Sequence, residues 1–219
     1  MLRAEFHCHT CYSKDSLLKI QDLLAVCQKK GLQRLVVTDH NTIQGALEAQ
    51  TLDPQRFIVG EEIMTQQGEL LAFFVTETVL AGLSATETIG ILRDQGAFIS
   101  VSHPFDAFRA GHWQPVDLLS LVSSIDAIEV FNSRCLLPQY NRHAEDFARQ
   151  HGLLATVGSD AHTLSEVGSA TLTLPDFNDP ASLKYALASA TPHVRLLAPW
   201  VHFYSRYAAW RKKTTAAIP

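Results

Sequence analysis

Histidine and carboxylate residues recur in this chain at spacings that suit metal binding. His7 and His9 are two residues apart in the stretch LRAEFHCH, and Asp160 and His162 repeat that spacing near the end of the chain. In an extended strand, side chains two residues apart point to the same side, so each pair can face one cation. Imidazole and carboxylate ligands suit zinc, manganese or iron, which polarise a phosphoryl oxygen and make hydroxide available near neutral pH. These pairs therefore point to metal-assisted hydrolysis.

The same residue types close several apolar, β-branched runs. The pattern predicts strands over 2–7, 34–39, 56–63, 97–103, 125–131 and 153–159. His, Asp, Glu or Asn stands at or just after the end of each one, as His7 and His9, Asp39 and His40, Glu61 and Glu62, His103, Glu129 and Asn132, and Asp160 and His162. In a barrel of alternating strands and helices, active sites are built at the carboxyl ends of the strands. We therefore expect these side chains to converge on one rim.

Amphipathic segments separate the runs. Helical spacing predicts helices over 19–31, 84–96 and 138–151 and near 180–190, and the runs 56–63 and 69–75 flank a QQG turn that favours a hairpin. Alternation of strand and helix is typical of a parallel α/β sheet, and about seven such units favour a small β/α barrel. The chain contains neither G-x-G-x-x-G nor G-x-x-x-x-G-K-[ST], which argues against dinucleotide and P-loop folds.

Composition limits the class of protein. The 219 residues are 47% hydrophobic and 18% charged, with a formal net charge of −4, which excludes a disordered chain and disfavours a non-specific nucleic-acid binder. We expect a single domain over 1–219, with a closing helix over about 199–213 that packs its aromatic side chains on the barrel. Four cysteines, no signal-peptide pattern and no apolar run of membrane-spanning length predict a cytoplasmic protein without a membrane partner.

The order of the motifs resembles the polymerase and histidinol phosphatase (PHP) family. His7-x-His9 is followed by YSKDS (12–16) and TDHN (38–41). GEEI (60–63), SHP (102–104), EVFN (129–132) and SDAH (159–162) continue in the family's order. The match runs from residue 5 to about 170. The resemblance implies a distorted (β/α)7 barrel with a metal cluster, often trinuclear, at the carboxyl ends of the strands.

The resemblance also implies three overlapping groups of ligands for two to three divalent ions of manganese, zinc or iron. The first comprises His7, His9, Glu62 and Asp160, the second Glu62, His103 and Asn132, and the third Asp15, His40 and His162. Asn132 stands where histidinol-phosphatase-like members have histidine and is a weaker ligand. Asp15 stands where some members have histidine, and its carboxylate favours a harder ion such as manganese.

Residues near this rim suggest how a substrate is handled. Arg134 could hold a phosphate with two hydrogen bonds, and Arg109 and His112 are further candidates for substrate binding. Asp106 could protonate a leaving alkoxide, and we expect Asp39 to assist catalysis by orienting a ligand histidine.

The expected function is a metal-dependent phosphoesterase that hydrolyses a small phosphomonoester, such as a nucleotide or histidinol phosphate. The alternatives are an exonuclease or phosphodiesterase acting on nucleic-acid ends, a non-catalytic interaction module stabilised by metal, and hydrolysis of a C–N bond as in amidohydrolase barrels. Cys8 and Cys11 form a C-x-x-C pattern, but without a second pair we expect core thiols and no zinc-thiolate site.

Overall fold

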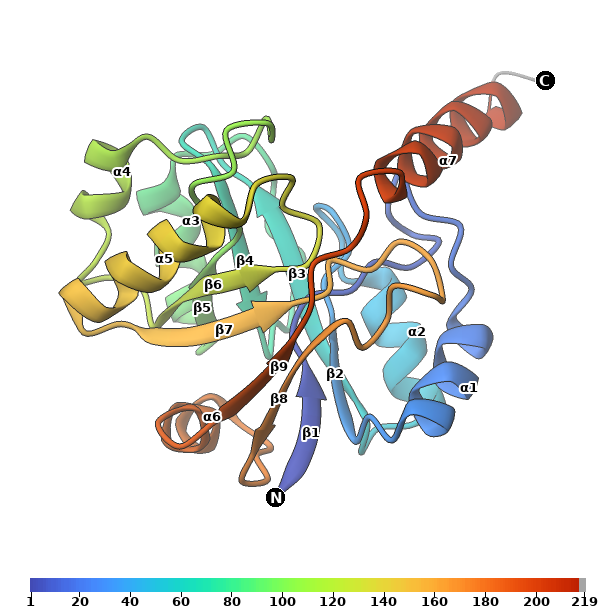
Figure 1. Ribbon diagram of the computed structural model, residues 1–219, viewed down its shortest axis with the longest axis horizontal. Helices are drawn as coiled ribbons and strands as arrows, with labels where there is room; N and C mark the ends of the chain where they lie inside the picture. Colours follow the sequence, from blue (N-terminus) through green and yellow to red (C-terminus); the bar gives the residue numbers. More distant parts are fainter. Residues whose placement is uncertain (217–219) are drawn as a thin grey trace.

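The computed structural model describes residues 1–216 and places the strands in one sheet with helices around it (Figure 1). Within this range the sheet order is β7-β6-β5-β4-β3-β2-β1-β8-β9. The strands are β1 (Leu2–Glu5), β2 (Arg34–Val37), β3 (Phe57–Met64), β4 (Glu69–Phe73), β5 (Phe98–Val101), β6 (Ala127–Asn132), β7 (Leu154–Gly158), β8 (Ala170–Leu174) and β9 (Thr191–Val194). The helices are α1 (Ile20–Lys30), α2 (Gln44–Leu52), α3 (Ala85–Asp94), α4 (Pro115–Ser120), α5 (Pro138–His151), α6 (Pro180–Leu187) and α7 (Val201–Ala216).

The sheet mixes parallel and antiparallel pairs and curls into a nearly closed barrel. β1, β2 and β3 are parallel, as are β5, β6 and β7, whereas β4 is antiparallel to both of its neighbours, and β8 is antiparallel to β1 and to β9. The segments that follow β1 and β7 pair with each other, because Asp160 N donates to His7 O at 2.9 Å and His9 N donates to Ala161 O at 2.9 Å. The barrel is thus drawn together at the rim where the predicted ligands lie, and the expected β/α barrel and the hairpin β3–β4 are confirmed.

Local sequence signals explain where several helices begin and end. Gly31 and Gly152 follow α1 and α5 with φ of 65° and 66°, a left-handed conformation that glycine adopts without steric cost. Ser84 and Glu87 form a capping box at the start of α3. The predicted bounds of these three helices therefore agree with the structure to within a few residues.

Apolar side chains fill the barrel and the space between the sheet and its helices. Phe6, Phe73, Phe98 and Phe177 belong to the cluster of buried side chains within the barrel. Cys8 belongs to the cluster that packs under the helices, which confirms that it points away from the neighbouring histidines. Cys11 is exposed, so the expectation of a core thiol is wrong at that position.

Helix α7 differs from the expected closing helix. Val201 and Ala208 are buried, but Trp200, Phe203, Tyr204, Tyr207 and Trp210 are exposed, and α7 extends away from the barrel (Figure 1). The aromatic side chains are therefore largely exposed to solvent, although Tyr204 adjoins Leu17 and Leu164 at the rim. Along residues 1–216, no helix combines the length and the apolar character needed to cross a membrane.

Candidate metal centre

The first predicted ligand group comes together at the carboxyl rim of the barrel. Nε2 of His9 lies 3.1 Å from Oδ1 of Asp160 and 3.4 Å from Oε2 of Glu62. Nε2 of His7 lies 3.3 Å from Oε1 of Glu62 and 3.7 Å from Oδ1 of Asp160. Donor atoms that share one ion at about 2.1 Å are about 3.0 to 3.5 Å apart. The four side chains are therefore spaced as ligands of a common cation.

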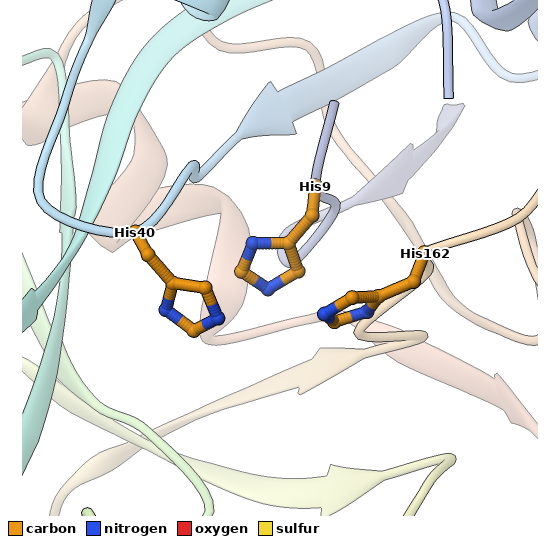
Figure 2. Close-up of side chains that lie close together, drawn as sticks. All are labelled: His9, His40 and His162. Carbon is orange, nitrogen blue, oxygen red and sulfur yellow. The ribbon is translucent and has the colours of Figure 1, made fainter. Parts of the chain in front are cut away.

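The third predicted group lies beside the first. Oδ2 of Asp15 is 3.3 Å from Nε2 of His162 and 3.5 Å from Nε2 of His40. The rings of His40 and His162 stand on either side of His9, with centroids 4.4 and 4.3 Å from that of His9 (Figure 2). Glu62 links the groups, because its Oε2 lies 3.0 Å from Nδ1 of His40. The groups thus form one continuous cluster.

The second group is arranged differently from the expectation. Nε2 of His103 lies 3.2 Å from Oε1 of Glu62, as predicted. The side-chain nitrogen of Asn132, however, donates to Glu129 and to Asp160, and its oxygen accepts a hydrogen bond from Arg134 N at 2.9 Å. Asn132 therefore turns its amide nitrogen toward the cluster, whereas a ligand would turn its oxygen there.

Three of the histidines are held through the ring nitrogen that faces away from the cluster. Nδ1 of His7 contacts Oε1 of Glu129 at 2.9 Å, and Nδ1 of His9 contacts Ser13 Oγ at 3.0 Å. Nδ1 of His162 contacts both Asp160 O, at 2.8 Å, and Nη1 of Arg134. Contacts of this kind orient metal-binding histidines and direct Nε2 toward the ion.

Asp39 reaches the cluster through another side chain. Its Oδ1 accepts hydrogen bonds from Thr10 N and from Ser13 Oγ, both at 2.6 Å, and its Oδ2 accepts one from Thr10 Oγ1 at 2.6 Å. Ser13 is in turn the partner of His9. The geometry agrees with the predicted orienting role of Asp39, and Ser13 is the group that transmits it.

The carboxylates of the cluster are held in the charged form. Burial disfavours ionisation of Glu62, but His7 and His40 outweigh it and hold the pKa of Glu62 well below its usual range. Burial also disfavours ionisation of Asp160, but Arg109 and His7 outweigh it and hold the pKa of Asp160 well below its ordinary value. These side chains are therefore anionic near neutral pH, as metal ligands must be.

His9 is held neutral. Burial and the nearby rings of His162 and His40 lower its pKa to about 3, so the His9 imidazole is uncharged near neutral pH. His7 behaves in the opposite way, because burial is outweighed by Glu62, Glu129 and Asp160, which raise its pKa. A bound cation would displace that proton.

Unpartnered buried atoms show that the cluster fits divalent ions. Among residues 1–216, the atoms without a hydrogen-bond partner include Oδ1 of Asp15, Oε2 of Glu62, both ring nitrogens of His103 and Oδ1 of Asp160. A buried polar atom without a partner costs free energy, and a bound cation would supply the missing partner. The donor set of imidazoles and carboxylates suits manganese, zinc or iron.

Two of these ligands also have unusual backbone conformations. His103 has a φ of 22° and Asp160 a φ of 53°, values that residues other than glycine rarely adopt. Such strain persists where the surrounding structure enforces it, and it concentrates at functional sites. The fold therefore imposes the positions of both side chains.

The loop after β5 brings Arg109, Asp106 and His112 to the rim. The Arg109 guanidinium contacts the Asp160 carboxylate and lies 3.5 Å, through Nε, from Oδ2 of Asp106. Asp106 is buried, and Nδ1 of His112 contacts Arg109 O at 2.7 Å. Arg109 and Asp106 therefore lie side by side next to the cluster, where their predicted roles would require them.

Arg134 is placed differently from the expectation. Its side chain is buried, and Nη2 donates to Val201 O at 3.2 Å and to Ser205 Oγ at 2.6 Å, while Nη1 donates to Asp160 O at 3.3 Å. These bonds occupy the donors that a phosphate would need. Arg134 thus anchors α7 to the segment after β7, a long-range contact that local sequence does not reveal.

Three residues that the sequence does not single out complete the site, namely Ser102, Ser13 and Glu69. Ser102 Oγ donates to Oε1 of Glu62 at 2.7 Å, and Glu129, which the sequence places at the rim, supports His7. Ser102 and Ser13 lie inside the motifs SHP and YSKDS, so their signal is adjacency to a ligand. Glu69, at the start of β4, brings Oε2 to 3.5 Å from Nε2 of His103.

The barrel and its cluster of imidazoles and carboxylates define a metal-binding β/α-barrel protein. Residues 5–67 match the PHP domain family, and residues 138–191 match the family of PHP-associated regions. The chain is 33% identical over 180 residues to the uncharacterized protein MJ0417 of Methanocaldococcus jannaschii, covering 81% of this chain and 72% of that protein. The chain therefore belongs to the PHP family, as the order of its motifs predicts.

Solved structures share the same fold. A protein from Bifidobacterium adolescentis, described as a metal-dependent phosphoesterase, superimposes with a TM-score of 0.64 and 18% identity, covering 84% of this chain and 95% of that one. The lesion-specific endonuclease PfuEndoQ from Pyrococcus furiosus has a TM-score of 0.60 and 15% identity, covering 90% of this chain and 59% of that one. Family and fold together support the predicted class, a metal-dependent hydrolase of phosphate esters.

Proposed function

We propose that this protein is a metal-dependent phosphoesterase that hydrolyses small phosphomonoesters with two or three divalent ions, manganese being the preferred one. The observation that carries the proposal is the shared position of Glu62. Its Oε1 lies 3.3 Å from His7 and 3.2 Å from His103, and its Oε2 lies 3.4 Å from His9 and 3.0 Å from His40. A carboxylate placed among four imidazoles in this way is suited to bridge ions.

The chain's own residues would bind and orient the ester. Ions held there would supply Lewis acidity toward the phosphoryl oxygens and a hydroxide near neutral pH. Arg109 is positioned to attract a phosphate oxygen while remaining paired with Asp160. Asp106, buried beside Arg109, is the group we propose as proton donor to the departing alkoxide.

A cleft beside the cluster supports a small organic leaving group. It has a volume of about 430 Å³, and His162 is one of its lining residues. Leu17, Leu164 and Tyr204 also line it, so apolar surface adjoins a predicted ligand. A site of this kind suits the apolar part of a phosphomonoester better than inorganic pyrophosphate.

Nucleic-acid ends are the second candidate substrate. Helix α7 carries Arg206, Arg211, Lys212 and Lys213 with no acidic residue, and it exposes aromatic side chains such as Trp210 that could stack on bases. The similarity in fold to an endonuclease agrees with this alternative. We favour the small substrate because the whole chain is acidic, with a net charge of −4.

Phosphate release distinguishes the candidates. The manganese-loaded protein should hydrolyse p-nitrophenyl phosphate and members of a panel of metabolite phosphomonoesters, and His9→Ala and Asp160→Ala should each reduce the rate at least about 100-fold. Glu145→Gln, a change on the exposed face of α5, should leave the rate unchanged. Release of nucleotides from single-stranded DNA without monoester hydrolysis would favour the second candidate, and no hydrolysis by a metal-loaded protein would favour a non-catalytic module.

The cellular compartment is part of the same proposal. Cys8, Cys11, Cys27 and Cys135 are all free thiols in the structure, which supports a reducing compartment such as the cytoplasm. Labelling of Cys11 in intact cells, with a thiol reagent that reaches only one compartment, would test this. In an oxidising compartment the exposed thiol of Cys11 would be oxidised and would not react with the reagent.

A further inference from the structure

We propose that Tyr204 of α7 forms a binding site for the leaving group of the substrate and selects phosphomonoesters whose alcohol carries a planar aromatic ring. The site is the cleft of about 430 Å³ beside His162, to which α7 contributes the Tyr204 side chain. This inference deepens the proposed function and rests on it, because it names the chemical class of ester that would be hydrolysed at the metal cluster.

Apolar side chains from three separate segments surround the cleft. Leu17 precedes α1, Leu164 follows β7, and Tyr204 lies on α7. Leu17 and Leu164 are each 37% exposed and Tyr204 is 57% exposed, so all three leave apolar surface in contact with water. A planar ring in the cleft would remove this surface from water and would stack on the face of Tyr204, a contact that an aliphatic chain does not make.

Polar side chains line another part of the same cleft. Lys19, Asp22 and Ser165 are exposed there, and they offer hydrogen-bond donors and acceptors to substituents on a ring. A few polar groups on a mainly apolar wall are typical of sites that fix the orientation of an organic ligand. A carbohydrate would use the polar groups but would leave the three apolar side chains uncovered. The lining therefore favours an aromatic alcohol over a sugar.

His162 joins the cleft to the metal cluster. The residue lines the cleft, and its Nε2 lies 3.3 Å from Oδ2 of Asp15 within the third predicted ligand group. A phosphate bound at the cluster would therefore have the cleft directly beside it. The alcohol portion of the ester would extend into the cleft, where its contacts hold the phosphorus in place for attack.

Hydrogen bonds hold α7 at two points near the rim. Nη2 of Arg134 donates to Oγ of Ser205, the residue next to Tyr204, at 2.6 Å. Further along the helix, Nζ of Lys212 donates to Cys11 O, in the loop after β1, at 2.5 Å. Although α7 extends away from the barrel, its first turns are thus fixed against the segments that carry predicted ligands (Figure 1). The backbone of Tyr204 is therefore held in a constant place beside the cleft, as a residue that determines specificity requires.

Tyr207 offers an internal comparison on the same helix. It is 51% exposed, close to the value for Tyr204, but within residues 1–216 it does not line the cleft. Its ring contacts Trp210 instead, with the two centroids 6.0 Å apart. The two tyrosines share residue type and exposure and differ in position, so Tyr207→Ala is a matched control for Tyr204→Ala. Both side chains are exposed, and neither substitution should lower the melting temperature of the protein.

The first test compares the hydrolysis of 2-phenylethyl phosphate and n-butyl phosphate by the manganese-loaded, full-length protein. Both esters release a primary alkoxide of similar basicity, so the comparison isolates the ring. We expect kcat/KM to be at least about tenfold higher for the ring ester. Tyr204→Ala should lower that value at least about tenfold, through KM and not kcat, because the contact is the same in the bound substrate and the transition state. Tyr204→Phe and Tyr207→Ala should both keep the preference of the wild type.

Binding of phosphonates separates this inference from the proposed function, because the C–P bond is not hydrolysed. Calorimetry on the manganese-loaded protein should give a Kd at least about tenfold lower for 3-phenylpropylphosphonate than for n-pentylphosphonate, and Tyr204→Ala should abolish the difference. Equal Kd values for the two phosphonates in the wild type, or equal losses in Tyr204→Ala and Tyr207→Ala, would overturn the inference. A wild type that binds the ring phosphonate selectively but hydrolyses no phosphomonoester would support the binding site and overturn the proposed function.

Discussion

Nδ1 of His7 lies 2.9 Å from Oε1 of Glu129, while Nε2 of the same ring faces Glu62 at 3.3 Å. The other oxygen of Glu129 accepts hydrogen bonds from His103 N at 2.9 Å and from the Asn132 side chain at 3.1 Å. One buried carboxylate on β6 therefore positions a ligand from β1 and another from β5. Residues that orient metal ligands in this way commonly affect affinity nearly as much as the ligands do.

Glu129→Gln should weaken metal binding without unfolding the protein. The amide would place an N–H group against either the His7 ring or the backbone N–H of His103, both of which need an acceptor. We expect the affinity for Mn²⁺ to fall about 10- to 100-fold, measured by competition with a fluorescent chelator. The control is Glu145→Gln, the same substitution at an exposed position of α5. Equal Mn²⁺ affinities of the two variants would contradict the positioning role of Glu129.

Gly158→Ala should disturb the contact between His7 and Glu129 by placing a methyl group against both residues. A Cβ atom at this position would lie 2.1 Å from Oε1 of Glu129 and 2.4 Å from Cβ of His7. Because both neighbours are buried, we expect a loss of about 1–3 kcal/mol in the free energy of unfolding together with weaker metal binding. Urea unfolding measures the first and chelator competition the second.

Gly90→Ala provides the matched comparison. Gly90 lies in α3, and a Cβ atom there would meet nothing within 4 Å. Alanine is the better helix former, so this variant should gain about 0.5–1 kcal/mol. The same substitution is thus expected to have opposite signs at the two positions, and a neutral Gly158→Ala would show that the rim can rearrange.

Ser13→Ala and Asp39→Asn should produce the same defect. If Asp39 orients His9 through Ser13, either change releases the His9 ring, and we expect each to lower metal affinity about tenfold. The double variant should then bind Mn²⁺ no more weakly than either single variant, because both substitutions break the same series of contacts from Asp39 through Ser13 to His9. Additive losses in a double-mutant cycle, measured as Mn²⁺ Kd values, would indicate that Asp39 acts separately from Ser13.

Most of the barrel could be predicted from the sequence, and so could the gathering of the expected ligand side chains at one rim. Parallel strands end at one rim, so a ligand at the end of an apolar run, such as His103 or Asp160, is located by its place in the chain alone. This rule fails for Glu69, because β4 runs antiparallel and its first residue, not its last, reaches the rim. An isolated glutamate before an apolar run has no local signal that distinguishes it from a surface residue.

Contacts between distant segments account for the remaining differences. The donors of Arg134 are engaged by Val201 and Ser205, about 70 positions further along the chain, and nothing near Arg134 in sequence indicates this. Asn132 is likewise set by the carboxylates of Glu129 and Asp160, which turn its nitrogen toward the cluster. Residue type predicts what a side chain can do, but its partners decide which of its atoms is available.

Asp126 should make stability depend on pH away from the metal cluster. Arg93 Nη1 lies 2.7 Å from Oδ2 of Asp126, Lys184 Nζ lies 2.5 Å from Oδ1, and Ile99 N donates to Oδ2 at 2.9 Å. Burial opposes the charge, but these partners outweigh it and lower the pKa of Asp126 below its usual value. Because the folded-state pKa is depressed, this stabilisation is present above the unfolded-state pKa near 4 and is lost as the pH falls through the folded-state value.

Asp126→Asn should therefore cost about 1–3 kcal/mol at pH 7 and progressively less below pH 4. Urea unfolding of the wild type and the variant at a series of pH values gives the difference directly, with chelator present so that metal loss at low pH does not contribute. Asp146→Asn is the control, since Asp146 and its partner Arg149 are 63% and 75% exposed and such pairs contribute little. If the difference between wild type and Asp126→Asn stayed constant down to pH 2.5, Asp126 would stabilise the fold by packing and not through its charge.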